Sequence, residues 1–281
     1  TYGRGLEIFD LKTGRKDTHL HNPKDSTSIP SSRVFVLYKA SNGCIYVGTS
    51  NGVCTYNPDQ RNFTRINSVI GRISAIIEDY HGKIWIGTNI SGLYSYNLKS
   101  RQTKLYQHSG DPKSLNKNVI TALTIDSKKR LWIGTYGQGI CRYNEETNDF
   151  TRYDHLELPN KIISSIIPKG NLLWISTNKG LVAYNPDTEH MKIYSKSNGL
   201  YNEQFTPRSG VESSDGRLFL GSTDGFCYFS PQDLRENNYN PPVVLTNMTI
   251  FGKEVQTNLS NSAIQHSITY TNEIILKHDQ S

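Results

Sequence analysis

The chain of 281 residues carries 31 Lys and Arg against 25 Asp and Glu, which gives a formal net charge of +6. No apolar run approaches the roughly 18 residues that a membrane-spanning helix requires, so the sequence holds no candidate for one. The basic residues are spread along the chain without a nucleic-acid-binding motif, and four cysteines are too few for a disulfide framework at this length.

A five-residue phrase returns five times along the chain. Its second residue is aromatic in every copy, and these aromatic residues lie 39, 47, 42 and 45 positions apart. The copies are Ile45–Thr49, Ile84–Thr88, Leu131–Thr135, Leu173–Thr177 and Leu218–Ser222. A period in the forties predicts a repeat architecture.

The surroundings of the phrase also repeat. A Gly and an apolar residue follow each copy, and then comes an aromatic residue, usually before Asn. The opening residues Thr1–Asp10 align with Thr135–Asn144, the second half of a repeat. We therefore expect the chain to open in the middle of a repeat and to belong to a longer array.

Four short segments rich in β-branched and aromatic residues fit into each period. In the third repeat they are Val119–Asp126, Arg130–Gly134, Gly139–Tyr143 and Asp149–Tyr153. Gly, Asn and Asp between them supply the positive φ angles of tight hairpin turns. Four antiparallel strands in about 40 to 45 residues predict a β-propeller blade.

The pattern within the strands supports stacked blades. Leu131–Thr135 is apolar on both faces, as expected of a strand covered by neighbouring sheets on both sides, and its Gly allows close approach. Apolar residues at helical spacing are absent between the phrases. The predicted fold is all-β: a propeller of four-stranded blades with five full repeats and an N-terminal half-repeat.

Three of the cysteines occupy the same position two residues after the repeat glycine: Cys54, Cys141 and Cys227. Equivalent positions in neighbouring sheets are about 10 Å apart, beyond the reach of a disulfide. We interpret these cysteines as small buried core residues, and we expect Cys44 to be unpaired as well.

The units resemble the two-component regulator propeller repeat of bacterial hybrid two-component sensors, especially of Bacteroides-type organisms. The linkers His21–Ile29 and His108–Asn116 resemble the connections that precede blades in that family, and Asn198–Phe205 resembles the entry to its last blade. Asn240–Val255 resembles the first strand of the immunoglobulin-like Y_Y_Y domain that follows such propellers, and Ser267–Leu276 fits its next strands. The resemblance divides the chain into a propeller array, residues 1–238, and a truncated Y_Y_Y domain, residues 239–281.

This resemblance implies the periplasmic portion of an inner-membrane protein. It implies a ligand-sensing region, itself non-catalytic, that recognises a polysaccharide breakdown product and signals to a cytoplasmic histidine kinase. The partners implied are an oligosaccharide, which the positive charge would allow to be acidic, and a second copy of the chain, contacted through the propeller and sandwich region. The full-length protein would be membrane-tethered, and this region would make no direct contact with nucleic acid.

Propellers bind ligands on the face that carries the loops between blades and between second and third strands. Sugars are held by planar polar groups and aromatic faces. The candidate ligand-binding residues are Arg72, Tyr136, Gln138, Lys161, Asn178, Tyr201 and Arg208.

No catalytic, metal or cofactor motif is found, so we expect no catalytic residue, metal or cofactor in this region. Two other functions stay open. A propeller-type polysaccharide lyase or glycosidase would need a convergent acid and base at the channel mouth. A eukaryotic-type interaction platform is disfavoured because the Gly-His and Trp-Asp signatures are missing.

Overall fold

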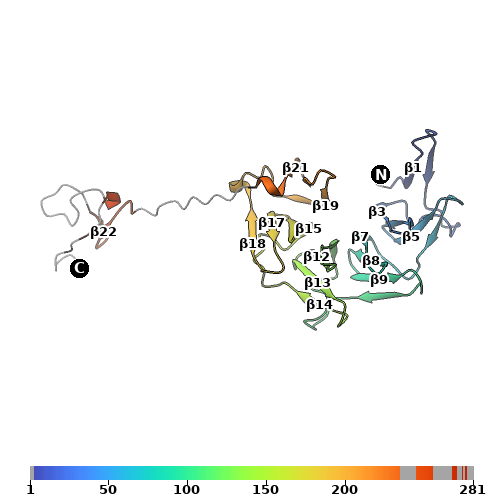
Figure 1. The fold of residues 1–281 in the computed structure, drawn as a ribbon, viewed down its shortest axis with the longest axis horizontal. Helices are drawn as coiled ribbons and strands as arrows, with labels where there is room; N and C mark the ends of the chain where they lie inside the picture. Colours follow the sequence, from blue (N-terminus) through green and yellow to red (C-terminus); the bar gives the residue numbers. More distant parts are fainter. Residues whose placement is uncertain (1–2, 235–244, 256–267, 271–273, 275, 277–281) are drawn as a thin grey trace. The chain divides into compact units, whose positions relative to one another are not determined.

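The structure is a computed structural model that describes residues 3–234, 245–255, 268–270, 274 and 276. The chain divides into two compact units, Thr1–Asp233 and Leu234–Ser281. The first unit holds the repeats, and its sheets follow one another around a common centre (Figure 1).

Five antiparallel sheets follow one another in the first unit, and each keeps its strands in chain order. The strands are β3 (Val34–Lys39), β4 (Ile45–Thr49), β5 (Gly52–Asn57) and β6 (Asn62–Arg65) in blade 1; β7 (Ile73–Glu78), β8 (Lys83–Thr88), β9 (Leu93–Asn97) and β10 (Thr103–Tyr106) in blade 2; β11 (Ile120–Ile125), β12 (Leu131–Thr135), β13 (Ile140–Asn144) and β14 (Asp149–Arg152) in blade 3; β15 (Ile163–Lys169), β16 (Leu172–Thr177), β17 (Gly180–Tyr184) and β18 (Met191–Tyr194) in blade 4; and β19 (Phe205–Glu212), β20 (Leu218–Ser222) and β21 (Gly225–Phe229) in blade 5. The predicted all-β propeller is confirmed, and the predicted strands of blade 3 agree with the observed ones to within about one residue at most ends.

The predicted half-repeat is a two-stranded sheet of β1 (Leu6–Phe9) and β2 (Lys16–His19). It covers the outer side of blade 1, where Leu6 packs in one buried cluster with Val47 and Phe63. The third and fourth strands of a repeat can therefore cover one face of the blade that follows along the chain.

The returning phrase forms the second strand of each blade. Its aromatic residue is almost fully buried in blades 1 to 4, at 0 to 2% exposure. Its glycine allows the blades to approach, because a Cβ on Gly134 would lie 2.7 Å from Cγ2 of Ile163 in the next blade. Gly48 and Gly87 meet Ile73 and Ile120 in the same way, which confirms the packing role predicted for this glycine.

The first strands of consecutive blades lie side by side around the centre of the propeller (Figure 1). In blades 1 to 4 the first strand contains a bulge of one residue near its start. The bulged residues are Phe35, Ser74, Thr121 and Ser164. A bulge re-aims a side chain without ending the sheet, so these positions differ from the rest of the strand.

Blade 5 has three strands within the described residues, and its outer face is open there. Phe219 stacks on Tyr228 with ring centroids 5.4 Å apart, and Tyr228 is 57% exposed. The aromatic residues at the position of Phe219 in the other blades are covered by a neighbouring sheet. No sheet of the described residues covers this face of blade 5, so its aromatic side chains stay accessible.

The two linkers that precede blades 1 and 3 have the same internal structure. His21 and His108 each place Nδ1 2.8 Å from a backbone carbonyl near the end of the linker, of Ile29 and Leu115. Arg152, from strand β14, donates from Nε to the carbonyl of Ser114 at 2.9 Å. The linkers are therefore ordered parts of the blades rather than passive connections.

All four cysteines are free, as predicted. Cys54 and Cys141 are fully buried, and burial raises the pKa of each thiol to about 12. The thiols are thus protonated at neutral pH and act as small core residues. The same prediction is wrong for Cys227, which is only half-buried because no sheet of the described residues covers that face of blade 5.

The described part of the second unit contains the short strands β22 (Thr249–Ile250) and β23 (Lys253–Glu254) and a 3₁₀ turn, η3 (Ile268–Tyr270). The predicted boundary between residues 238 and 239 and most of the predicted Y_Y_Y strands lie outside the described residues. The first unit has two further 3₁₀ turns, η1 (Lys196–Asn198) and η2 (Pro231–Asp233), and no described helix is long and apolar enough to cross a membrane.

Candidate functional site

The seven candidate residues lie at one end of the propeller, where the blades are joined. In every blade the first strand starts and the second strand ends at this end, because the two strands are antiparallel. The loops between second and third strands therefore meet the connections that enter the next blade. We call this end the loop face, as distinct from the opposite face formed by the turns between first and second strands.

Four of the candidates lie on adjoining loops of blades 3 and 4. Gly137, between Tyr136 and Gln138, donates its N–H to the carbonyl of Lys161 at 3.0 Å. Asn178 donates its N–H to the carbonyl of Ile162 at 3.2 Å. The loops are thus held by backbone bonds, which leaves the ring of Tyr136 53% exposed.

Two further candidates meet around an aromatic ring that the sequence analysis did not select. Arg72 places Cζ 4.1 Å from the ring centroid of Phe35, and Arg208 places Cζ 5.7 Å from the same centroid. The bulged residue is Phe35 in blade 1 but Ser or Thr in blades 2 to 4, and a comparison of the aligned repeats could have revealed this difference.

Tyr201 stands apart from the other six candidates. It is 81% exposed in the connection that enters blade 5. Its neighbour Asn202 is fixed by a hydrogen bond from Nδ2 to Asp224 Oδ2 at 2.8 Å. Among the described residues, no hydrogen bond, ion pair or ring contact joins Tyr201 to the arginine pair or to the loops of blades 3 and 4, so the structure does not bring it to a shared site.

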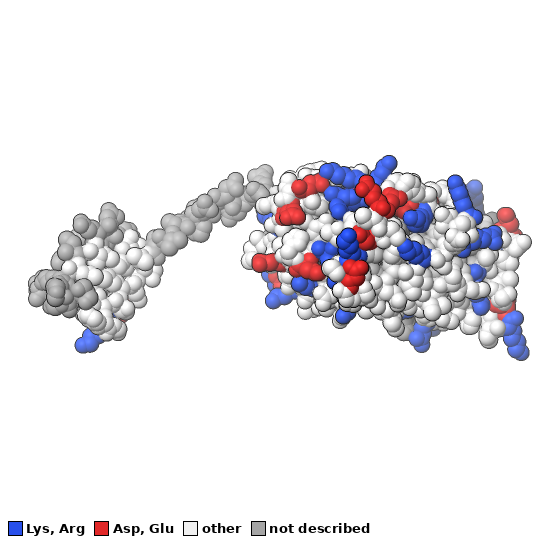
Figure 2. Space-filling model, turned by 90° about the horizontal axis from the view of Figure 1, so that it is seen from below, with Lys and Arg blue, Asp and Glu red and all other residues white. Residues whose placement is uncertain are grey.

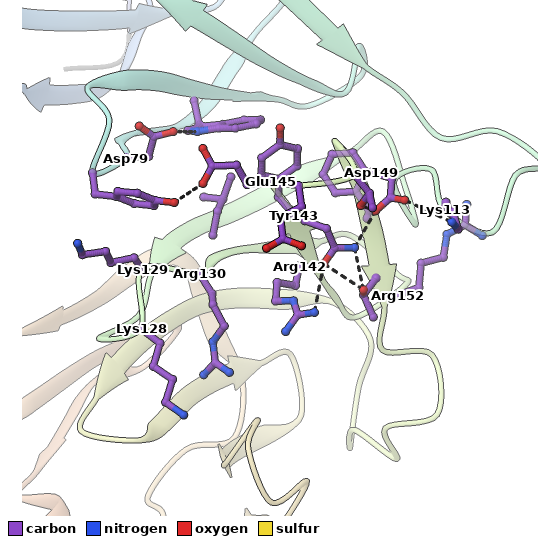
Figure 3. A pocket seen from close by; sticks show the side chains of 18 of the residues that line it. Asp79, Lys113, Lys128, Lys129, Arg130, Arg142, Tyr143, Glu145, Asp149 and Arg152 are labelled. Atoms are coloured by element: carbon purple, nitrogen blue, oxygen red, sulfur yellow. Dashed lines mark hydrogen bonds and ion pairs between the residues drawn. The ribbon is translucent and has the colours of Figure 1, made fainter.

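A large cavity, of about 1170 Å³, opens on the opposite face, between the turns of blades 2 and 3 (Figure 3). The turn Lys128–Arg130 lines it, as does the turn that carries Glu145 and Glu146. From the sequence, both turns are predicted to be exposed to solvent, and nothing in their composition indicates that they line a common cavity. Its walls come from residues about 65 positions apart, which only the packing of the blades brings together.

Two charged residues that line this cavity, Arg130 and Glu145, bind groups of neighbouring blades. Arg130 donates from Nη1 to Asp187 of blade 4 at 2.8 Å and from Nε to Asp126 of its own blade at 2.6 Å. Glu145 accepts a short hydrogen bond from the hydroxyl of Tyr80 and lies 3.0 Å from His81 Nε2. The bond from Tyr80 is the largest cause that lowers the pKa of Glu145, and His81 adds to it.

These pairs join blades 2, 3 and 4, so we interpret them as structural contacts that hold neighbouring blades together. On the side of the first unit seen in Figure 2, Lys and Arg are likewise interspersed with Asp and Glu rather than gathered into one basic patch. Among the described residues, no group of three or more His, Cys, Asp and Glu side chains could hold a metal ion.

The chain was compared with known protein families. The model of the two-component regulator propeller matches residues 69–89 and 114–137. Both matches fall on the first two strands of a blade, of blade 2 and of blade 3. They include the returning phrase and the bulged first strand, which are the features that the stacking of blades depends on.

Among curated proteins, the chain is similar to histidine kinase P4 of Formosa agariphila, with 25% identity over 287 aligned residues. The alignment covers 98% of this chain and 21% of that protein. The chain thus spans about a fifth of the length of this relative.

Three solved structures share the fold. The extracellular domain of a putative one-component system from B. thetaiotaomicron has 19% identity and a TM-score of 0.65, over 99% of this chain and 43% of that one. The extracellular domain of a putative hybrid two-component system from the same organism has 22% identity and a TM-score of 0.55, over 88% and 39%.

The third structure is PorZ, a surface component of the type-IX secretion system of Porphyromonas gingivalis, with 16% identity and a TM-score of 0.62, over 82% of this chain and 36% of PorZ. At these identities the likeness concerns the fold. Taken with the two repeat matches, it supports one conclusion about family: the chain carries repeats of the two-component regulator propeller family.

Proposed function

We propose that this chain is part of the extracytoplasmic sensing region of a hybrid two-component histidine kinase. The observation that carries this proposal is the match of two blades to the regulator propeller, within an alignment to a histidine kinase that covers 98% of the chain. The region itself is non-catalytic. The kinase is a separate part of a longer protein, and the region described here is the periplasmic portion of an inner-membrane protein.

The ligand of this region is a polysaccharide breakdown product bound on the loop face. Support comes from the types of side chain found there: the exposed ring of Tyr136 lies beside Gln138 and Lys161 on loops fixed by backbone hydrogen bonds. An aromatic face with planar polar neighbours is suited to stack on a sugar ring and to bond its hydroxyl groups. Fixed loops lower the entropy cost of binding.

Signalling requires a second copy of the chain, contacted through the propeller and the second unit. Ligand binding changes the arrangement of the two copies in the dimer, and this change alters the activity of the kinase. This region does not contact nucleic acid directly. These statements follow from the proposed membership in a two-component sensor. Sedimentation with and without ligand tests whether two copies of the chain associate.

A calorimetric titration with a library of polysaccharide fragments tests the ligand claim. Any fragment that binds is then titrated into variants with a substitution on the loop face or on the opposite face. Tyr136→Ala should weaken binding of any hit by about ten-fold, since one stacked aromatic ring contributes about 1 to 1.5 kcal/mol. Tyr80→Ala, which removes a tyrosine of similar exposure (48% against 53%) on the opposite face, is the matched control. A library without a hit contradicts the ligand claim, and a loss only in Tyr80→Ala moves the ligand to the large cavity.

The alternative of a polysaccharide lyase or glycosidase is tested with the same preparations. Incubation of the chain with the parent polysaccharides should leave their length unchanged. New reducing ends or unsaturated products, formed at a rate that falls in a loop-face variant, would show catalysis and overturn the non-catalytic assignment.

A further inference from the structure

Three residues from three different blades converge on the loop face: Phe35 of blade 1, Arg72 at the entry to blade 2 and Arg208 of blade 5. We call them the arginine cluster. Both guanidinium carbons lie within 6 Å of the Phe35 ring centroid, at 4.1 Å for Arg72 and 5.7 Å for Arg208. Each distance is within the range of a cation–π contact.

The backbone explains how Phe35 and Arg72 meet. Phe35 is the extra residue of the bulge in β3, which turns its side chain away from the regular alternation of that strand. Arg72 immediately precedes β7, and the carbonyl of Arg72 accepts a hydrogen bond at 3.1 Å from the N–H of Asn89. This hydrogen bond fixes the backbone of Arg72 to the end of the second strand of its own blade.

Arg208 is brought to the cluster by a wider bulge. Phe205 and Gly210 are five positions apart on β19, whereas their partners Ser222 and Leu220 are only two apart on β20. The other four blades have a bulge of one residue here. Arg208 has a φ of 64°, a left-handed conformation that few non-glycine residues adopt and that occurs preferentially at functional sites.

Hydrogen bonds fix this bulge on both sides. Ser209 Oγ lies 2.6 Å from the carbonyl of Thr206 and 2.9 Å from that of Gly221, as a donor to either. Ser164 of blade 4 donates from Oγ to the carbonyl of Phe205 at 2.7 Å. The unusual backbone at Arg208 is thus held by specific contacts, which is what keeps a costly conformation populated.

The charges of the cluster are not balanced by the protein. Among the described residues, no carboxylate lies within 4.0 Å of either guanidinium of the cluster. The pKa of Arg208 lies below its ordinary value because the surrounding protein removes water from it and because the charge of Arg72 repels it. An anion placed between the two guanidinium groups would replace this repulsion by two attractions.

We propose that the arginine cluster binds the anionic group of the ligand, a carboxylate or a sulfate on an acidic sugar. Guanidinium groups present paired N–H donors that match the oxygens of such anions, and the ring of Phe35 holds them in place. The identity of the ligand as a sugar rests on the proposed function, whereas binding of the anion does not.

The experiment titrates the chain with three probes: a trisaccharide of galacturonate, the neutral trisaccharide of galactose, and inorganic sulfate at constant ionic strength. Calorimetry measures affinity, and the side-chain Nε–Hε signals of arginine in NMR spectra report which arginines take part. The variants are Arg72→Gln and Arg208→Gln. Arg101→Gln is the matched control, because Arg101 is also exposed and has a φ of 57° but lies in the turn between β9 and β10.

We expect the galacturonate trisaccharide to bind more tightly than the neutral one and sulfate to compete with it. Each cluster variant should weaken binding about 10- to 100-fold, the range for a hydrogen bond to a charged group, and Arg101→Gln should leave it unchanged. Circular dichroism and thermal unfolding establish that the variants are folded.

The outcomes separate this inference from the proposed function. Equal binding of the acidic and neutral trisaccharides, unchanged in both cluster variants, would overturn the anion site and leave the sensor proposal intact. Arginine-dependent binding of sulfate without binding of either sugar would support the anion site while counting against a sugar ligand. If neither the acidic sugar nor sulfate binds, the inference is wrong.

Discussion

At the scale of single residues, the most informative position is the aspartate that directly follows the first strand of blades 2 and 3. Asp126 is 8% exposed, and its Oδ2 accepts the indole N–H of Trp132 at 2.9 Å. Asp79 binds Trp85 in the same way at 2.8 Å. Pro168 stands six residues before Trp174 in blade 4, and the indole nitrogen there is buried without a partner in the described structure. The sequence pattern showed the tryptophans but not this pairing.

We predict that Asp126→Ala lowers the free energy of unfolding by about 3 kcal/mol, because it leaves a buried indole N–H without an acceptor and removes one of the two carboxylates that Arg130 binds. Asp126→Asn, which keeps an acceptor for the indole, should lose clearly less. Urea denaturation followed by tryptophan fluorescence measures both. Equal losses in the two variants would mean that the ion pair, and not the indole bond, provides the stability.

At the scale of strands and blades, the returning phrase acts through its smallest residue. Gly134 has an ordinary φ, so its requirement for glycine is one of space and not of backbone conformation. The Cβ of an alanine would lie 2.7 Å from Ile163 Cγ2 and 3.2 Å from Ala122 Cβ. Both neighbours are buried, so the added methyl group would have to displace a packed side chain or the backbone.

Gly134→Ala should therefore destabilise the propeller by about 1 to 3 kcal/mol, the usual range for overpacking a core. Gly110→Ala is the matched control, since no atom lies within 4 Å of its Cβ position and its φ is not positive. Thermal unfolding of the two variants provides the comparison. Equal stability of the two would show that the blades can separate slightly without cost.

The contact between blades 3 and 4 also depends on charge. Asp187 accepts hydrogen bonds from Lys128, at 2.9 Å, and from Arg130, and these two bonds lower the pKa of Asp187 below its ordinary value of 3.8. Because the pKa of Asp187 is lower in the folded state than in the unfolded chain, protonation of this carboxylate at acid pH favours unfolding. The contribution of Asp187 is complete above pH 3.8 and is lost as the pH falls through the lower pKa of the folded state.

Asp187→Asn should therefore be less stable than the parent chain at pH 7, and the difference should narrow as the pH falls below about 4. Unfolding midpoints between pH 7 and pH 2 check this. Glu157→Gln, which changes a carboxylate that has no ion-pair or hydrogen-bond partner among the described residues, is the control. A difference that stays constant with pH would show that the lost packing of the side chain, and not its charge, matters.

At the scale of the whole molecule, the chain divides into two compact units, Thr1–Asp233 and Leu234–Ser281. Within the described residues, the buried clusters of the propeller are formed by residues of the first unit. The identity of the second unit as the start of a Y_Y_Y domain remains a prediction, because most of residues 235–281 lie outside the described residues.

We predict that residues 1–233 alone unfold in the same cooperative transition as the full chain, with a midpoint within a few degrees. The reason is that the buried clusters formed by the described residues of the propeller lose no member. Calorimetry of the two chains is the measurement. A large drop in the midpoint would show that residues 234–281 contribute to the stability of the propeller and would contradict this prediction.

The sequence by itself determined the number of repeats, the four strands of a blade, the opening half-repeat and the unpaired cysteines. These features are local: a turn signal, an alternation or a small residue acts within a few positions, and five copies make the pattern unmistakable. The loop-face candidates Tyr136, Gln138 and Lys161 could also be predicted, because their place follows from strand direction alone.

Only the tertiary structure decided which side chains meet. Phe35 and Arg208 are 173 positions apart and come together through two bulges and the packing of five blades. The large cavity likewise joins turns from separate blades, each of which alone reads as solvated. The physical reason is that a repeat fixes its own strands through local hydrogen bonds and turns, whereas a site at the channel mouth depends on the ring into which the repeats pack.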